Sequence, residues 1–120
     1  MSHLVTIQCK FHDPAAVHTA CQRLGLAAPR QGTAKLFSGE ATGLIVQLPG
    51  WQYPAVIDTA AGAICYDNFQ GHWGDQRELE KLLQAYSVEK AKLEARKRGC
   101  TVSEQTLQDG SIKLQITQPA

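Results

Sequence analysis

The last third of the chain has the clearest structural pattern. A charged stretch ends at Gly99, and two short segments follow, Cys100 to Leu107 and Ser111 to Thr117, separated by Asp109-Gly110. Asp-Gly is typical of tight hairpins, because a type I′ turn needs positive φ at both central residues and these residue types tolerate it best. The pattern predicts a long helix, a glycine stop and a C-terminal hairpin. We expect one face of this hairpin to be buried, formed by Ile112, Leu114 and Ile116.

The long helix is expected to begin at Asp75, because Glu78 three residues later completes a D-x-x-E capping box. Its first half has apolar residues at helical spacing, and the stretch from Glu89 to Arg98 is polar. At 1.5 Å per residue such a helix is ~35 Å long, more than a small core needs. Its C-terminal end should therefore project or lie on the surface. The predicted core stripe is Leu79, Leu82, Leu83 and Tyr86.

The N-terminal part predicts one strand and one helix. Leu4 to Phe11 alternates apolar and polar residues, as a half-buried strand does. Asp13-Pro14 is a helix start, because Asp accepts backbone N–H groups at the N-cap and Pro is favoured at the first helical position. Gly25 supplies the stop. The expected core stripe of this helix is Val17, Ala20, Cys21 and Leu24.

The middle of the chain predicts four strands in two hairpins. Ala34 to Glu40 and Leu44 to Leu48 are separated by Ala41-Thr42-Gly43, and Ala55 to Asp58 turns through Ala60-Ala61-Gly62 into Ala63 to Tyr66. The full order is strand, helix, four strands, helix, two strands. Because hairpins predominate, we expect a single α+β domain over residues 1–120, a two-layer sandwich with a mainly antiparallel sheet and both helices on one face.

Composition and charge exclude some classes of protein. The net charge of +1 gives no general attraction to nucleic acid or anionic lipid. The longest apolar runs, such as Gly43 to Leu48, are far shorter than the ~18 residues of a membrane span. No secretory signal is visible and the four cysteines are scattered, so we expect a cytoplasmic protein with free thiols and no membrane association.

Several segments resemble a known family. The opening Met1-Ser2-His3-Leu4 and the helix end at Leu24-Gly25 resemble those of an uncharacterised conserved open-reading-frame family of cyanobacteria and algal plastids with bacterial relatives, a domain-of-unknown-function family. The closing helix and hairpin resemble it in residues and spacing, at Gln84-Ala85-Tyr86, Gly99, Val102-Ser103-Glu104-Gln105 and Asp109 to Leu114. The resemblance implies an accessory protein, in some members encoded beside AAA-type ATPases, with no assigned catalytic residues.

Metal-binding and catalytic constellations are weak. Cys9-x-x-His12 and His18-x-x-Cys21 supply zinc ligand types, but strand and helix geometry place the members of each pair on different faces. We therefore expect no metal, no cofactor and no catalytic residues. A weaker alternative is a small enzyme or ligand-binding domain around Cys65, Asp67 and His72.

Two aromatic loops are the candidate contact surface, one that contains Trp51 and Tyr53 and one from Phe69 to Trp73. Aromatic side chains held in loops often bind a partner. The competing interpretation is that these aromatics close the core. We expect an accessory or adaptor protein that binds a protein partner, either an AAA-type ATPase or another protein encoded in the same operon. The alternative is an RNA- or DNA-binding module that uses the sheet face and the basic helix end from Lys90 to Arg98. The candidate binding residues are Trp51, Tyr53, Tyr66, Asn68, Phe69, His72 and Trp73.

Overall fold

The computed structural model describes residues 5–8 and 10–119. Its elements, in chain order, are β1 (Val5–Gln8), α1 (Pro14–Arg23), β2 (Arg30–Leu36), β3 (Gly39–Val46), β4 (Ala55–Asp58), β5 (Ala63–Tyr66), a 3₁₀ turn η1 (Phe69–Gly71), α2 (Gln76–Lys97), β6 (Thr101–Thr106) and β7 (Ile112–Thr117).

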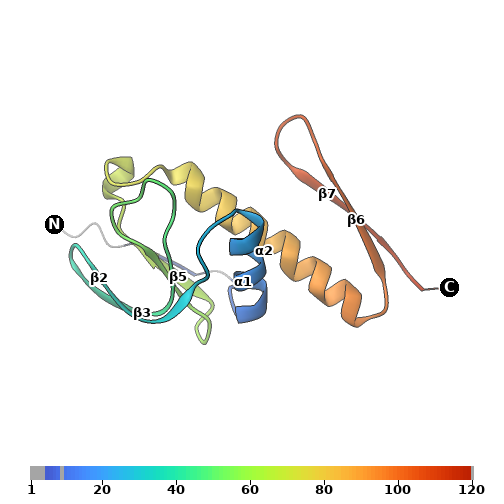
Figure 1. Cartoon of the computed structure of the whole chain (residues 1–120), viewed down its shortest axis with the longest axis horizontal. Coiled ribbons are helices and arrows are strands. Elements are labelled where there is room, and N and C mark those ends of the chain that lie inside the picture. The colour runs from blue at the N-terminus through green and yellow to red at the C-terminus, as the bar shows by residue number, and fades with distance from the viewer. Residues whose placement is uncertain (1–4, 9, 120) are drawn as a thin grey trace.

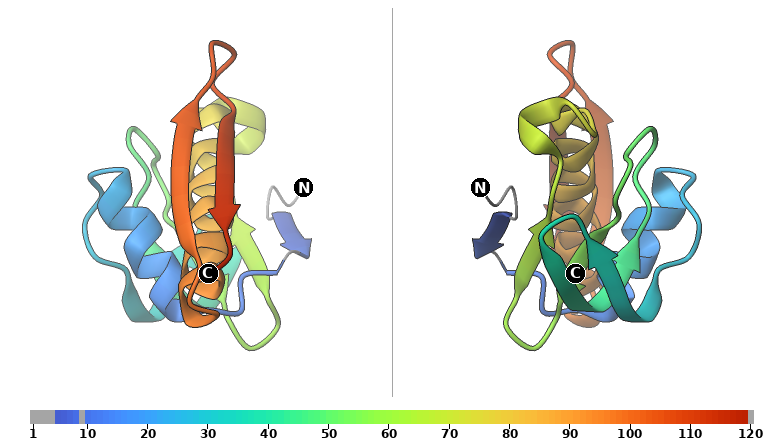
Figure 2. Two further views of the ribbon diagram at one scale, coloured as in Figure 1. Left: turned by 90° about the vertical axis from the view of Figure 1, so that its right-hand side faces the viewer. Right: turned by 90° about the vertical axis from the view of Figure 1, so that its left-hand side faces the viewer.

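The predicted α+β architecture is confirmed. Strands β2 to β5 form an antiparallel meander, and β1 joins it beside β5, which makes a five-stranded sheet of order β1-β5-β4-β3-β2. Helices α1 and α2 pack against each other and cover one face of this sheet (Figure 1). Figure 2 shows the same arrangement from the two ends of the molecule, with α2 foreshortened.

The core lies between this sheet face and the two helices. The register places Ile57 opposite both Leu44 and Ile64, so these three side chains point to the same side of the sheet. The helices contribute both predicted stripes, with Val17, Ala20 and Cys21 from α1 and Leu79, Leu82 and Tyr86 from α2 buried, whereas Leu24 and Leu83 are partly buried at the margin.

The helix ends follow the predicted signals, with one correction. The Asp13 carboxylate accepts hydrogen bonds from the N–H groups of Ala15 and Ala16, at 3.0 and 3.4 Å, and Pro14 is the first helical residue. In α2 the Asp75 carboxylate accepts from the N–H of Arg77 at 2.9 Å, not from Glu78 as a capping box requires. Gly25 and Gly99 both have positive φ just beyond the helix ends.

The first predicted hairpin turn is wrong. The strands turn at Phe37-Ser38, and the predicted break at 41–43 lies inside β3. Gly43 has a different role there: it lies opposite Gly32 of β2, and a Cβ atom on it would collide with the backbone of Ile57. Beyond this glycine pair the hairpin bends, and its tip lies on the same side as the loop that leads into α2 (Figure 1). The second predicted hairpin, β4 to β5, is confirmed.

The C-terminal hairpin is a separate two-stranded sheet. It lies along the second half of α2, beyond the main sheet (Figures 1 and 2), in a molecule that measures 56 × 32 × 23 Å. The prediction that α2 extends past the core is therefore confirmed, and its exposed length is partly covered by β6 and β7.

The predicted type I′ turn is wrong, because Asp109 does not have positive φ. The connection is longer: the Gly110 N–H donates to the Leu107 carbonyl at 3.0 Å, the Leu107 N–H donates to the Ser111 carbonyl at 2.8 Å, and only Gly110 takes the left-handed conformation. The predicted buried face is also only partly buried. Ile112 and Leu114 are half-buried, whereas Ile116 is 49% exposed, because the hairpin packs on one helix and not on a second layer.

Candidate functional site

Four aromatic rings meet near the start of α2. The Trp73 ring is central: its centroid lies 4.9 Å from that of Phe37, 5.5 Å from that of Tyr53 and 4.8 Å from that of Phe69. We call these four residues the aromatic cluster. His72 packs at its margin, 4.8 Å from the Phe69 ring. The two loops predicted from the sequence therefore do come together, through Tyr53 and Trp73.

Three separate segments position the aromatic cluster. Phe37 comes from the β2–β3 turn, Tyr53 from the loop before β4, and the other two rings from the loop that contains η1. In that loop Phe69 and Gln70 have φ of 48° and 54°. The left-handed conformation costs a non-glycine residue roughly 1–2 kcal/mol. Consecutive strained residues persist only where surrounding contacts hold them, and such strain is concentrated at functional sites.

The aromatic cluster lies at the surface. Its rings are outside the main core, and Phe37 is 56% exposed, while Tyr53, Phe69 and Trp73 are half-buried. Phe37 was missing from the sequence-based candidates, because the expected strand Ala34 to Glu40 included it. Ser38-Gly39, a typical turn dipeptide, is the signal that would have placed Phe37 in a turn.

Three of the predicted binding residues are buried and support the loops from inside. Trp51 packs edge-on against Tyr66, with centroids 5.6 Å apart, and its Nε1 donates to the Asp75 carbonyl at 3.0 Å. The Asn68 amide nitrogen donates to Gln76 Oε1 at 2.7 Å and to the Gly74 carbonyl at 3.3 Å. These contacts fix the loop to the start of α2, so the side chains of Trp51, Tyr66 and Asn68 do not form part of an outer surface.

Asp67 lies directly behind the β2–β3 turn. Its side chain is fully buried, and its Oδ2 accepts one long hydrogen bond, 3.5 Å, from Ser38 Oγ. Its Oδ1 has no hydrogen-bond partner in the described part of the chain. Buried carboxylate oxygens nearly always have a partner, because an unpaired one loses its hydration without compensation.

The alternative catalytic grouping is not assembled. Cys65 is half-buried and pairs in register with Val56 and Thr6, whereas His72 is exposed beside Phe69. Within residues 5–8 and 10–119 no hydrogen bond joins Cys65, Asp67 and His72.

The predicted zinc-type pairs do not converge either. His12 Nδ1 donates to the Thr59 carbonyl at 3.0 Å, Cys21 is buried in the core and His18 is exposed, while Cys9 lies outside the described residues. Among the residues that the structure describes, no group of three His, Cys, Asp or Glu side chains has metal-binding geometry. Cys21, Cys65 and Cys100 carry free thiols.

The other end of α2 is joined to α1 and β6 by an ion-pair cluster. Arg23 of α1 contacts Glu104 of β6 at 2.9 Å and the buried Glu89 of α2 at 3.3 Å, and Lys92 contacts the same two carboxylates at 3.4 and 3.6 Å. The hydrogen bond from Arg23 lowers the pKa of Glu104, and the reciprocal interaction raises the pKa of Arg23.

The predicted basic helix end is partly paired. Lys90 contacts Glu94 at 2.8 Å and the N-cap Asp13 at 3.0 Å, and the hydrogen bond from Lys90 is the main cause of the lowered Asp13 pKa. Glu94 also contacts Lys97 at 3.5 Å. Within the described residues, Arg96 and Arg98 form no ion pair.

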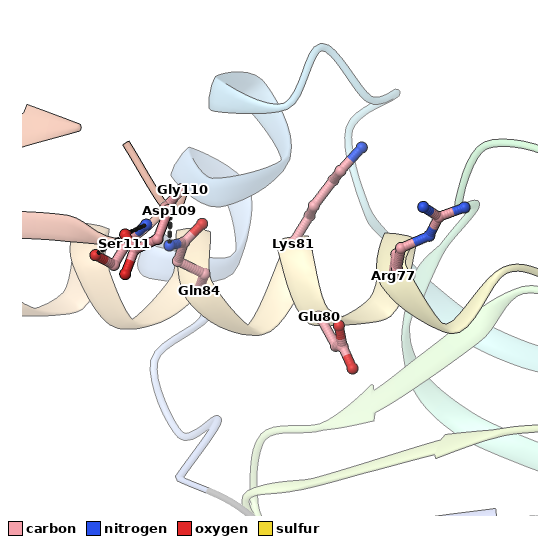
Figure 3. Close-up of a pocket in the computed structure, with 7 residues that line it drawn as sticks. All are labelled: Arg77, Glu80, Lys81, Gln84, Asp109, Gly110 and Ser111. Atoms are coloured by element: carbon pink, nitrogen blue, oxygen red, sulfur yellow. Dashed lines mark hydrogen bonds between the residues drawn. The ribbon is translucent and has the colours of Figure 1, made fainter. Parts of the chain in front are cut away.

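A shallow groove of about 460 Å³ separates the middle of α2 from the β6–β7 turn (Figure 3). Gln84 closes one end by donating to the Gly110 carbonyl at 3.0 Å. Arg77 and Lys81 extend from α2 on one side and Glu80 points away from them (Figure 3). Arg77 and Lys81 already pair with Asp75 and Glu78, so the groove presents no concentrated charge.

No family model, curated protein or solved structure matches this chain. No helix in the described residues has the length and apolar character that crossing a lipid bilayer requires.

Proposed function

We propose that this protein is an accessory or adaptor module without chemistry of its own, which binds a protein partner through the aromatic cluster. The observation that carries this proposal is the exposed ring of Phe37, held against Trp73 at the tip of a curved hairpin. Aromatic side chains dominate the binding energy of many protein interfaces, because they bury large areas at low entropic cost. We infer the kind of partner from the family resemblance: the first candidate is an AAA-type ATPase, which the protein would meet in the cytoplasm.

Charge distribution supports a protein partner over a nucleic acid. Lys90, Lys92 and Lys97 each contact a carboxylate, which leaves Arg96 and Arg98 as the cations of this helix end that form no ion pair within the described residues. The helices cover one face of the sheet, so a nucleic acid that binds the sheet could use only the opposite face.

The experiment is affinity capture from the source cells with the wild type and two matched variants. The double variant Phe37→Ala/Trp73→Ala should lose the partner while still unfolding cooperatively. Ile116→Ala removes a comparably exposed apolar side chain at the hairpin end and should retain the partner. Equal capture by all three proteins would contradict the proposal. Recovery of nucleic acid alone, lost at high salt, would favour the alternative.

A further inference from the structure

Asp67 and the aromatic cluster together have the chemistry of a cation-binding site. We propose that the partner inserts an arginine side chain at the β2–β3 turn, where its guanidinium packs on the exposed rings and pairs with the Asp67 carboxylate. This inference rests on the proposed function and specifies the partner chemistry that the same surface would select.

The first argument is the unsatisfied carboxylate. Within residues 5–8 and 10–119, Asp67 Oδ1 has no hydrogen-bond partner, and no Lys, Arg or His side chain forms an ion pair with Asp67. Its neighbour Asn68 donates its amide hydrogens to Gly74 and Gln76 instead. A buried charge without a partner is destabilising, and a donor supplied from outside removes that cost.

The second argument is access. In the part of the chain that the structure describes, the side chain that hydrogen-bonds to Asp67 is Ser38, which follows Phe37 in the exposed turn. At 3.5 Å this bond is at the limit of hydrogen-bonding distance. A displacement of the turn would break this bond and uncover the side of the carboxylate that Ser38 covers, next to Phe37 of the aromatic cluster.

The third argument is the match between arginine and this pair of features. A guanidinium stacks on aromatic faces and donates two parallel hydrogen bonds to a carboxylate, whereas the ammonium of lysine is a more strongly hydrated point charge. Phe37 and Trp73 supply the faces and Asp67 supplies the acceptor. An arginine within an apolar segment fits both features at once.

The test uses small defined probes and the full chain. Acetyl-arginine amide should give saturable NMR shifts at the backbone amides of Ser38 and Asp67 and at the Trp73 indole. Acetyl-citrulline amide has nearly the same shape without the charge and should bind at least about tenfold more weakly, since charged pairs in such sites contribute more than 1.4 kcal/mol. Equal shifts with both probes, or none with either, would overturn the inference.

Variants give an independent check. Asp67→Asn should weaken the arginine probe at least about tenfold, while Asp109→Asn, which changes a carboxylate in the β6–β7 turn, should leave binding unchanged. In the capture experiment, loss of the partner by Phe37→Ala/Trp73→Ala but not by Asp67→Asn would refute the arginine site and leave the proposed function standing. Retention of the partner by every variant would refute both. The probe comparison in the wild type remains decisive even where a variant fails to fold.

Discussion

The two ends of α2 are stabilised in different ways. Along its second half, two cations, Arg23 and Lys92, pair with two carboxylates, Glu89 and Glu104, and hold the β6–β7 hairpin against the helix. At its N-terminal end, a strained loop holds the half-buried rings of Phe69 and Trp73 against the exposed Phe37, and the neighbouring Asp67 has a carboxylate oxygen without a hydrogen-bond partner among the described residues. A region whose polar groups satisfy one another has an internal structural role. A region that leaves a polar group unsatisfied beside exposed apolar surface is the better candidate for binding.

The largest expected effect separates the buried tryptophan from the exposed one. Trp51→Ala should lower the free energy of unfolding by about 3–5 kcal/mol, as truncation of a packed tryptophan does, because its ring contacts Tyr66 and Gly74 inside the domain. Trp73→Ala should cost markedly less, since Trp73 is half-buried. Urea unfolding of both variants measures the difference. Equal losses would mean that the aromatic cluster is part of the core.

A smaller effect tests the contact between Gly74 and Trp51. A Cβ atom at Gly74 would lie 2.5 Å from the Trp51 ring, so Gly74→Ala should destabilise the protein by about 1–3 kcal/mol, in the range of overpacking substitutions. The matched control is Gly39→Ala in the β2–β3 hairpin, where a Cβ atom meets nothing within 4 Å. Thermal unfolding compares the two. A Gly74 variant as stable as the Gly39 variant would show that the ring shifts freely.

At the hairpin end, Gly110 is the residue most sensitive to substitution. Its φ of 88° is strained for any other residue, so Gly110→Val should weaken the β6–β7 hairpin by roughly 1–2 kcal/mol. Hydrogen exchange should accelerate in β6 and β7 while β3 to β5 remain protected, because the two sheets are separate. Uniform acceleration in both sheets would show that they unfold as one unit.

The smallest effect concerns pH. The folded-state pKa of Glu104 is lowered by Arg23, so its contribution to stability is present above the ordinary glutamate pKa of roughly 4.3 and is lost as the pH falls through the lowered value. Carbon-detected NMR titration of the Glu104 carboxyl should give a pKa below the ordinary glutamate value. Glu104→Gln should remove the low-pH loss of protection in β6. A Glu104 pKa at or above the ordinary value would contradict this assignment.

Local signals predicted much of the fold. Asp13-Pro14, Gly25, Asp75 and Gly99 mark the helix ends because capping depends on a few neighbouring residues. The separation of the C-terminal hairpin from the main sheet was not predictable, because strand partners are chosen by long-range packing. The same reason explains the missed turn: Gly39 and Gly43 are both compatible with a chain reversal, and contacts with β4 decide between them.

The candidate site was only partly predictable. Tyr53, Phe69, His72 and Trp73 were identified from loop composition, and they do lie together. Loop composition does not distinguish a ring that faces solvent from one such as Trp51 that closes the core. The position of Phe37 and the surroundings of Asp67 depend on the curvature of the β2–β3 hairpin. This curvature brings Phe37 against Trp73 and Ser38 against Asp67, which are far apart in the sequence.

Site-specific photocrosslinking tests most directly whether the aromatic end is the binding surface. A photoreactive phenylalanine analogue is placed at position 37 in one protein and at position 116 in another, which compares exposed positions at opposite ends of the molecule. Irradiation in the source cells should give a discrete protein adduct at Phe37 and none at Ile116. An adduct at Ile116 alone, or no protein adduct at Phe37, would contradict the proposed role of the aromatic cluster.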